Sequence, residues 1–237
     1  MLAEVLLLMA AMMLITVGQW IGFDQMAPFF REFDFHTKHE WVGRITVGIV
    51  QVGIIAFALL DGVTSHWGVA LFTAYILHDV GHMLVYEKDV TTYLHHLVAA
   101  TVTGLMKLTM TAQQAESIGL AATVLESTGP VLHTTWLLKQ AGYSSEPWFK
   151  YIAGAAAAFF GVMRCGVFPW VMAKKMDKVT AMVAAPFLVL NVYWFWKIIK
   201  MMLKVLERKE EDASNSEQSR EASSCSRGSK CGKPPQH

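Results

Sequence analysis

Long apolar runs recur along this chain and are separated by short polar segments. A helix rises about 1.5 Å per residue, so crossing the roughly 30 Å hydrocarbon core of a bilayer takes about 20 mostly apolar residues. Runs of that length predict an all-α integral membrane protein with about seven transmembrane helices: Leu2–Ile21, Trp41–Leu60, Gly68–Tyr86, Thr92–Met110, Ile118–Leu138, Tyr151–Met172 and Val179 to about Met202.

The segments around these runs set the predicted domain organisation. The first run has no basic residues before it and no small-residue cleavage site, which predicts a retained helix over 1–22 rather than a signal peptide. Residues 23–37 include Pro28, aromatics and charges, which predicts an interfacial loop before a six-helix domain over 38–206. Over 207–237 the apolar period stops and polar residues dominate, which predicts a disordered tail.

Composition supports a membrane protein. Hydrophobic residues make up 54% of the 237 residues and charged residues only 16%, and the mean hydropathy is +0.36; these values exceed ordinary globular usage. The formal net charge of +1 gives no indication of a nucleic-acid partner. Cys165, Cys225 and Cys231 form no disulfide framework typical of small secreted domains.

Polar residues inside the predicted helices are candidates for function, because ionisable groups are costly in hydrocarbon and usually face the bundle interior. The connection over 87–91 is short, so the third and fourth runs form an antiparallel hairpin. His82, His95 and His96 then lie at one depth, roughly 6 Å inside the boundary. His133 on the fifth run reaches a similar level on the same side. Together these imidazoles predict a functional cavity.

Further polar residues lie deeper. His78 and Asp79 are one turn below His82, and His78 shares a helix face with it. Tyr75 and Trp194, near the ends of runs, are interpreted as interfacial belt residues. A second polar layer near the midplane is predicted from one residue on each of four runs: Gln51, Glu126, Arg164 and Asn191. Glu126 and Arg164 are predicted to form a buried ion pair.

Three chemistries could use such a cavity. In acyl transfer, a neutral imidazole takes a proton or the acyl group while Asp79 orients it. A metal site would use imidazole nitrogens from His78, His82, His95, His96 and His133, although we expect no metal. A polar recess without catalysis would recognise a lipid headgroup or a helix of another protein.

The order of these motifs resembles the TLC-domain family, which includes the TRAM proteins, the Lag ceramide synthases and the CLN relatives. The resemblance covers roughly Lys38 to Leu206 and rests on motifs in five of the runs: Trp41, Arg44, Asp79, the pair His95 and His96, the segment Glu126-Ser127-Thr128-Gly129-Pro130, Trp136, Leu137, Arg164 and Pro169.

The resemblance implies a barrel of six helices preceded by one extra helix, with the paired histidines in the central cavity. It also implies the endoplasmic reticulum, with the plasma membrane or the Golgi as alternatives. In ceramide synthases the pair serves transfer of a fatty acyl group from acyl-CoA to a sphingoid base. Those enzymes carry an acidic stretch after the pair, where this chain reads Leu125 to Pro130. The pattern is closer to the shorter TLC-domain proteins, with roles in lipid composition, sensing or trafficking.

The leading interpretation is therefore a protein that binds membrane lipid in its barrel and contributes to lipid homeostasis. The lining is predicted from residues in several runs: His78, His82, Glu126, His133, Arg164 and Asn191. The enzyme alternative assigns catalysis to His95, His96 and Asp79, with acyl-CoA as co-substrate and no other cofactor. A third alternative is a lipid sensor or trafficking adaptor, whose partner is a second copy of the chain or a cytosolic protein bound to the tail.

Basic residues predict the orientation, because the side richer in Lys and Arg faces the cytosol. Most of them fall on the side of the C-terminal tail. An epitope tag after His237 should therefore be removed by protease added to intact vesicles, and a tag before Met1 should be protected. The opposite result would invert the orientation.

Overall fold

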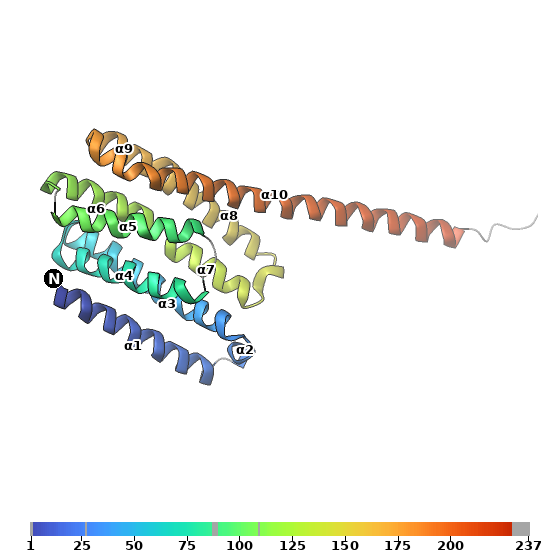
Figure 1. Cartoon of the computed structure of the whole chain (residues 1–237). Helices are drawn as coiled ribbons and strands as arrows, with labels where there is room; N and C mark the ends of the chain where they lie inside the picture. The colour runs from blue at the N-terminus through green and yellow to red at the C-terminus, as the bar shows by residue number, and fades with distance from the viewer. Residues whose placement is uncertain (1, 27, 87–89, 109, 229–237) are drawn as a thin grey trace, which may run out of the picture. The chain divides into compact units, whose positions relative to one another are not determined.

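The computed structural model describes residues 2–26, 28–86, 90–108 and 110–228. Figure 1 shows the helices in chain order. Their bounds are α1 (Leu2–Met26), α2 (Pro28–Arg31), α3 (Phe35–Leu60), α4 (His66–Tyr86), α5 (Val90–Leu108), α6 (Ala112–Glu126), α7 (Gly129–Gln140), the 3₁₀ turn η1 (Tyr143–Ser145), α8 (Phe149–Phe160), the π-helix η2 (Gly161–Val167), α9 (Phe168–Lys175) and α10 (Lys178–Gly228).

The all-helical class and the seven-helix count are confirmed in the described residues. The first four predicted runs coincide with α1, α3, α4 and α5. The fifth run coincides with the pair α6 and α7, the sixth with the series α8, η2 and α9, and the seventh with the first part of α10. Four helical segments are long and apolar enough to cross a membrane: Leu2–Gln25, Phe35–Leu60, Phe149–Lys175 and Lys178–Leu203.

The fifth predicted run is divided between two helices. The α-helical pattern stops at Glu126 and resumes at Gly129, and Pro130 in the first turn of α7 has no N–H to donate to the preceding turn. The Ser127 amide closes α6 on the Thr123 carbonyl at 3.0 Å, and the Leu132 amide opens α7 on the Thr128 carbonyl at 3.1 Å. The break directly follows Glu126, the last residue of α6.

Residues 23–37 are mostly helical, where the sequence analysis expected an interfacial loop. Helix α1 continues to Met26, α2 follows directly, and the Asp34 carboxylate caps the start of α3 by accepting the Thr37 amide at 3.0 Å. The polar residues that suggested a loop serve as the caps of these helices. The hydrogen bond that the Thr37 hydroxyl donates to the Asp34 carboxylate, and then the bond from the Thr37 amide, hold the pKa of Asp34 below its ordinary value.

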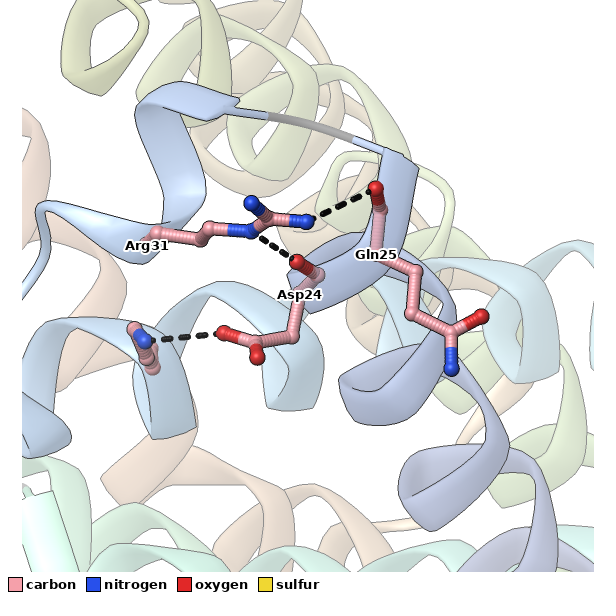
Figure 2. A network of polar contacts seen from close by, with 4 residues as sticks. Asp24, Gln25 and Arg31 are labelled. Carbon is pink, nitrogen blue, oxygen red and sulfur yellow. Dashed lines mark hydrogen bonds and ion pairs between the residues drawn. The ribbon is translucent and has the colours of Figure 1, made fainter.

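The end of α1 is closed by basic side chains from the next two helices. Arg31 of α2 donates to the backbone carbonyls of Asp24 and Gln25, the second at 3.1 Å, and Lys38 of α3 pairs with the Asp24 carboxylate at 3.0 Å (Figure 2). Carbonyls at a helix C-terminus lack partners within the helix and carry partial negative charge, so cations satisfy them well.

The chain divides into two units, 1–195 and 196–237. In the second unit the helix continues to Gly228, where a disordered tail was expected from residue 207. The segment Glu207–Glu211 consists of Glu, Arg and Lys, which have high helix propensity. Such residues favour a helix even where no face of that helix is buried.

In the first unit an apolar core joins α1, α3, α4, α5, α6, α9 and α10. Its buried members include Val50 and Ile54 of α3, Ile76 of α4 and Phe168 of α9. Large apolar side chains also cover the outer faces of these helices, as expected where a helix meets hydrocarbon instead of water.

A close approach between α6 and the α3–α4 loop gives a test of this packing. A Cβ on Gly119 would lie 2.6 Å from the Val63 carbonyl oxygen, whereas a Cβ on Gly154 of α8 would have nothing within 4 Å. We expect Gly119→Ala to destabilise the protein by about 1–3 kcal/mol through overpacking. We expect Gly154→Ala, the control, to be neutral or stabilising by up to about 1 kcal/mol. Thermal denaturation in detergent, followed by size-exclusion chromatography, measures both, and equal midpoints for the two variants would contradict the packing.

Candidate functional site

A cavity of about 70 Å³ lies inside the first unit, between α3, α4, α5, α6, α9 and α10. Its wall is mainly apolar, and its polar side chains are His95 of α5 and Thr123 and Glu126 of α6. A water molecule needs roughly 10–15 Å³ of such space, so the cavity holds several water-sized groups but not a whole phospholipid. It suits a narrow part of a lipid, such as one end of a chain.

His95 is held in place by aromatic rings of α10. Its ring lies 5.2 Å from the Phe187 ring and 5.2 Å from the Trp194 ring, both in edge-on contact. Trp194 in turn donates its indole N–H to the Thr91 hydroxyl at 3.0 Å, which ties α10 to the first turn of α5. The Nδ1 atom of His95 is buried and has no hydrogen-bond partner among the described residues. A buried imidazole nitrogen left free in this way is available to a ligand.

His96 forms the polar pair that the enzyme alternative requires. Its Nε2 lies 3.0 Å from Oδ2 of Asp79 on α4, and both side chains are buried. A carboxylate accepts hydrogen bonds, so this contact places the imidazole proton on Nε2 and leaves Nδ1 of the neutral ring as the basic nitrogen. That Nδ1 has no partner within the described part of the chain. A carboxylate that orients an imidazole is the arrangement by which general bases are held in position.

Glu126 is bound from α3. The Gln51 amide donates to Oε2 of Glu126 at 2.6 Å and to the Tyr75 hydroxyl at 3.4 Å. Gly129, the first residue of α7, makes room for Gln51, because a Cβ there would overlap the amide. The Tyr75 ring lies edge-on to the His96 ring, 6.3 Å away. Glu126 and the Asp79–His96 pair are thus linked through Gln51 and Tyr75.

Arg164 has other partners than the predicted one. It lies on η2 and donates to the Leu125 carbonyl at 2.7 Å, the Thr128 hydroxyl at 2.7 Å and the Asn191 side-chain oxygen at 3.0 Å. No salt bridge between Arg164 and Glu126 is present in the described residues, so the predicted direct ion pair is wrong. At the break between α6 and α7 the Leu125 carbonyl accepts two hydrogen bonds, from the Arg164 guanidinium at 2.7 Å and from the Thr128 hydroxyl at 3.0 Å.

Two more predicted histidines belong to different groups. Nε2 of His78 lies 3.4 Å from the Thr16 hydroxyl of α1. Nδ1 of His133 lies 3.3 Å from the Arg44 guanidinium. Arg44 also pairs with Glu40 at 2.6 Å and lies over the Trp136 ring. The described imidazoles therefore do not share one hollow: His95 alone among them lines the cavity.

The remaining predicted lining residues divide in the same way. Asn191 is fully buried and meets Arg164 instead of the cavity. The side chain of His82 lies outside the described residues. Among the residues described, no group of three or more His, Cys, Asp or Glu side chains is arranged to hold a metal ion.

Sequence reasoning missed two residues at the site. Tyr75 and Trp194 were interpreted as interfacial, yet Tyr75 is 3% exposed and contacts His96, and Trp194 packs on His95. One signal was available for Tyr75: it precedes Asp79 by four residues and so lies on the same helix face. For Trp194 no local pattern shows that α10 passes beside α5.

Comparison with known proteins now adds one finding. The TLC-domain family model matches residues 57–200, which is more than half of the chain and contains the histidine pair, Arg164 and all of the cavity lining except Ile54. The chain belongs to the TLC-domain family. Trp41 and Arg44, which also suggested the resemblance, precede the matched region. No curated protein and no solved structure matches the chain. The family suggests a function related to membrane lipids.

The bonds of Arg164 give a test of the site's framework. Arg164→Leu would leave the Thr128 hydroxyl and the Asn191 side-chain oxygen without the donor they now have, and would leave the Leu125 carbonyl only its bond from the Thr128 hydroxyl. We expect a loss of stability of roughly 3–5 kcal/mol, because an uncompensated buried polar group is strongly destabilising. The exposed Lys150, the second residue of α8, is the control, and Lys150→Leu should change the denaturation midpoint little. Comparable midpoints for the two variants would contradict this account.

Proposed function

We propose that this TLC-domain protein binds a membrane lipid in the cavity between α3, α4, α5, α6, α9 and α10, and contributes through it to membrane lipid homeostasis. One observation carries the proposal: an otherwise apolar cavity places His95 and Glu126 at its buried end, with His95 Nδ1 unsatisfied. Apolar walls with a few convergent polar groups are the usual character of small-molecule sites.

We further propose the finer arrangement that the family implies. Helices from α3 to α10 form a six-helix barrel around the cavity, α1 packs outside it, and the C-terminus faces the cytosol. The membrane is that of the endoplasmic reticulum, with the Golgi and the plasma membrane as alternatives. A protein tag visualised beside organelle markers distinguishes these membranes.

Lipid binding is tested by co-purification. The full chain is isolated in nanodiscs, and the lipids enriched over empty nanodiscs are identified by mass spectrometry. We expect one lipid class to be enriched, and we expect His95→Ala to reduce that enrichment about tenfold, because the substitution removes the only described imidazole that lines the cavity. His66→Ala is the matched control, since His66 is exposed at the start of α4. Equal lipid content in wild-type and empty nanodiscs would contradict the proposal.

The second candidate function is acyl transfer from acyl-CoA to an amine such as a sphingoid base. The Asp79–His96 pair favours it, because the carboxylate leaves Nδ1 of His96 as a positioned base. That nitrogen would take the proton of the attacking amine as the amine nitrogen bonds to the thioester carbonyl and the CoA thiolate leaves. The proton then passes to that thiolate, so free thiol and amide are the products.

The acyl-transfer candidate predicts loss of product without loss of lipid. Acyl-CoA and a sphingoid base are supplied to the protein in nanodiscs, and amide and free thiol are measured. Asp79→Asn keeps the size of the side chain but removes its charge, and it should lower the rate by about 10²–10⁴, the range of general base catalysis. Lipid enrichment should be unchanged in this variant. Product formation equal to that of empty nanodiscs would remove the enzyme candidate and leave a lipid sensor or trafficking adaptor, whose partner is a second copy or a cytosolic protein at the tail.

A further inference from the structure

The cavity has a polar end and an apolar end. His95 is 7% exposed and Glu126 is 4% exposed, while Gly62, in the loop between α3 and α4, is exposed at the other end of the lining. From Gly119 to Glu126, α6 follows the cavity for seven residues, or about 10 Å. The stretch between is lined by apolar side chains such as Ala99, Ile118 and Ala121. A ligand with one polar end is therefore held in one direction.

The chemistry of the buried end selects the kind of polar group. Gln51 binds one oxygen of the Glu126 carboxylate, and the other has no hydrogen bond within the described part of the chain. A carboxylate oxygen accepts hydrogen bonds, and a neutral imidazole nitrogen can accept or donate according to its tautomer. The buried end thus offers one certain acceptor, on Glu126, and one adaptable nitrogen, on His95.

The charges nearby disfavour an ionic group. A carboxylate ligand would face the like charge of Glu126 in apolar surroundings. An ammonium ligand carries three N–H donors, and the mainly apolar wall offers it few acceptors beyond Glu126, so burying that cation would be costly. A hydroxyl adds no charge and can donate a hydrogen bond to Glu126. It can also form a hydrogen bond with His95 whichever tautomer the imidazole adopts, because a hydroxyl both donates and accepts.

We propose that the cavity binds a neutral single-chain lipid head first, with a hydroxyl group between Glu126 and His95 and the chain running toward Gly62. This inference rests on the proposed function, since it concerns the same cavity. It adds the chemical class of the ligand, a long-chain alcohol or a lipid with a hydroxyl on one chain, and the direction in which the ligand lies.

Head chemistry is tested with three probes of equal chain length: dodecanol, dodecanoate and dodecylamine. Each competes with a photoreactive dodecanol for the full chain in nanodiscs. We expect dodecanol to compete at least about tenfold more strongly than either ion. In Glu126→Gln the amide can donate to a carboxylate, so the preference over dodecanoate should shrink severalfold while dodecanol still binds. Equal competition by either ion in the wild-type protein, or an unchanged preference in Glu126→Gln, would overturn the hydroxyl assignment.

Direction is tested by the position of labelling. A diazirine beside the hydroxyl of the photoreactive dodecanol should label peptides around His95 and Phe187, and labelling confined to Gly62–Val69 would overturn the head-first direction. Ala58 lines the cavity near Gly62, and Ala56 on the same helix is exposed and does not line it. Ala58→Trp should reduce labelling about tenfold, and Ala56→Trp should not.

The outcomes separate the two proposals. If none of the three probes competes and no lipid is enriched, the proposed lipid site itself fails. If lipid is enriched but the ions compete equally or the label appears near Gly62, lipid binding stands and only the hydroxyl, head-first inference is overturned.

Discussion

The guanidinium of Arg164 is buried where hydrocarbon-like side chains surround it, so its donors must be satisfied by protein groups. Leu125, Thr128 and Asn191 provide those acceptors, and two of the three lie at the break between α6 and α7. The guanidinium thus binds the interrupted stretch between α6 and α7, next to Glu126, the last residue of α6. The π-helix that carries Arg164 belongs to a class of local distortions frequently found at functional sites.

The same requirement divides the other polar side chains into local groups. The hydroxyls of Thr16 and Thr46 lie 3.2 Å apart and join α1 to α3, and His78 extends this group to α4. His133 on α7 is bound by Arg44 on α3, which forms a second, separate polar group. Each pairing satisfies a group that would be costly alone, and each removes an imidazole from the cavity. His95 differs because its ring packs edge-on against the rings of Phe187 and Trp194 and lines the cavity.

Sequence reasoning named polar residues that the structure buries, but it did not give all of their partners. The short connection over 87–91 predicted the histidine pair level with His82 and one turn from Asp79, and the structure pairs His96 with Asp79 at 3.0 Å. The predicted ion pair of Glu126 and Arg164 failed because the backbone carbonyl of Leu125 became available only through the helix break. The expected loop over 23–37 failed for a related reason: its polar residues cap helix ends, and caps and loops use the same residue types.

By itself, the sequence determined that this is an all-helical chain of seven apolar helices, since hydrophobic length and composition depend only on residues near one another in the chain. The sequence also determined the family, because the order of its motifs along the chain can be recognised without knowing which residues are in contact. Only the tertiary structure decided which histidine lines the cavity, that Tyr75 links Glu126 to His96, and that Trp194 supports His95. Those facts depend on helix rotation and on contacts between residues far apart in sequence, such as Thr91 and Trp194, and periodicity alone carries no information about either.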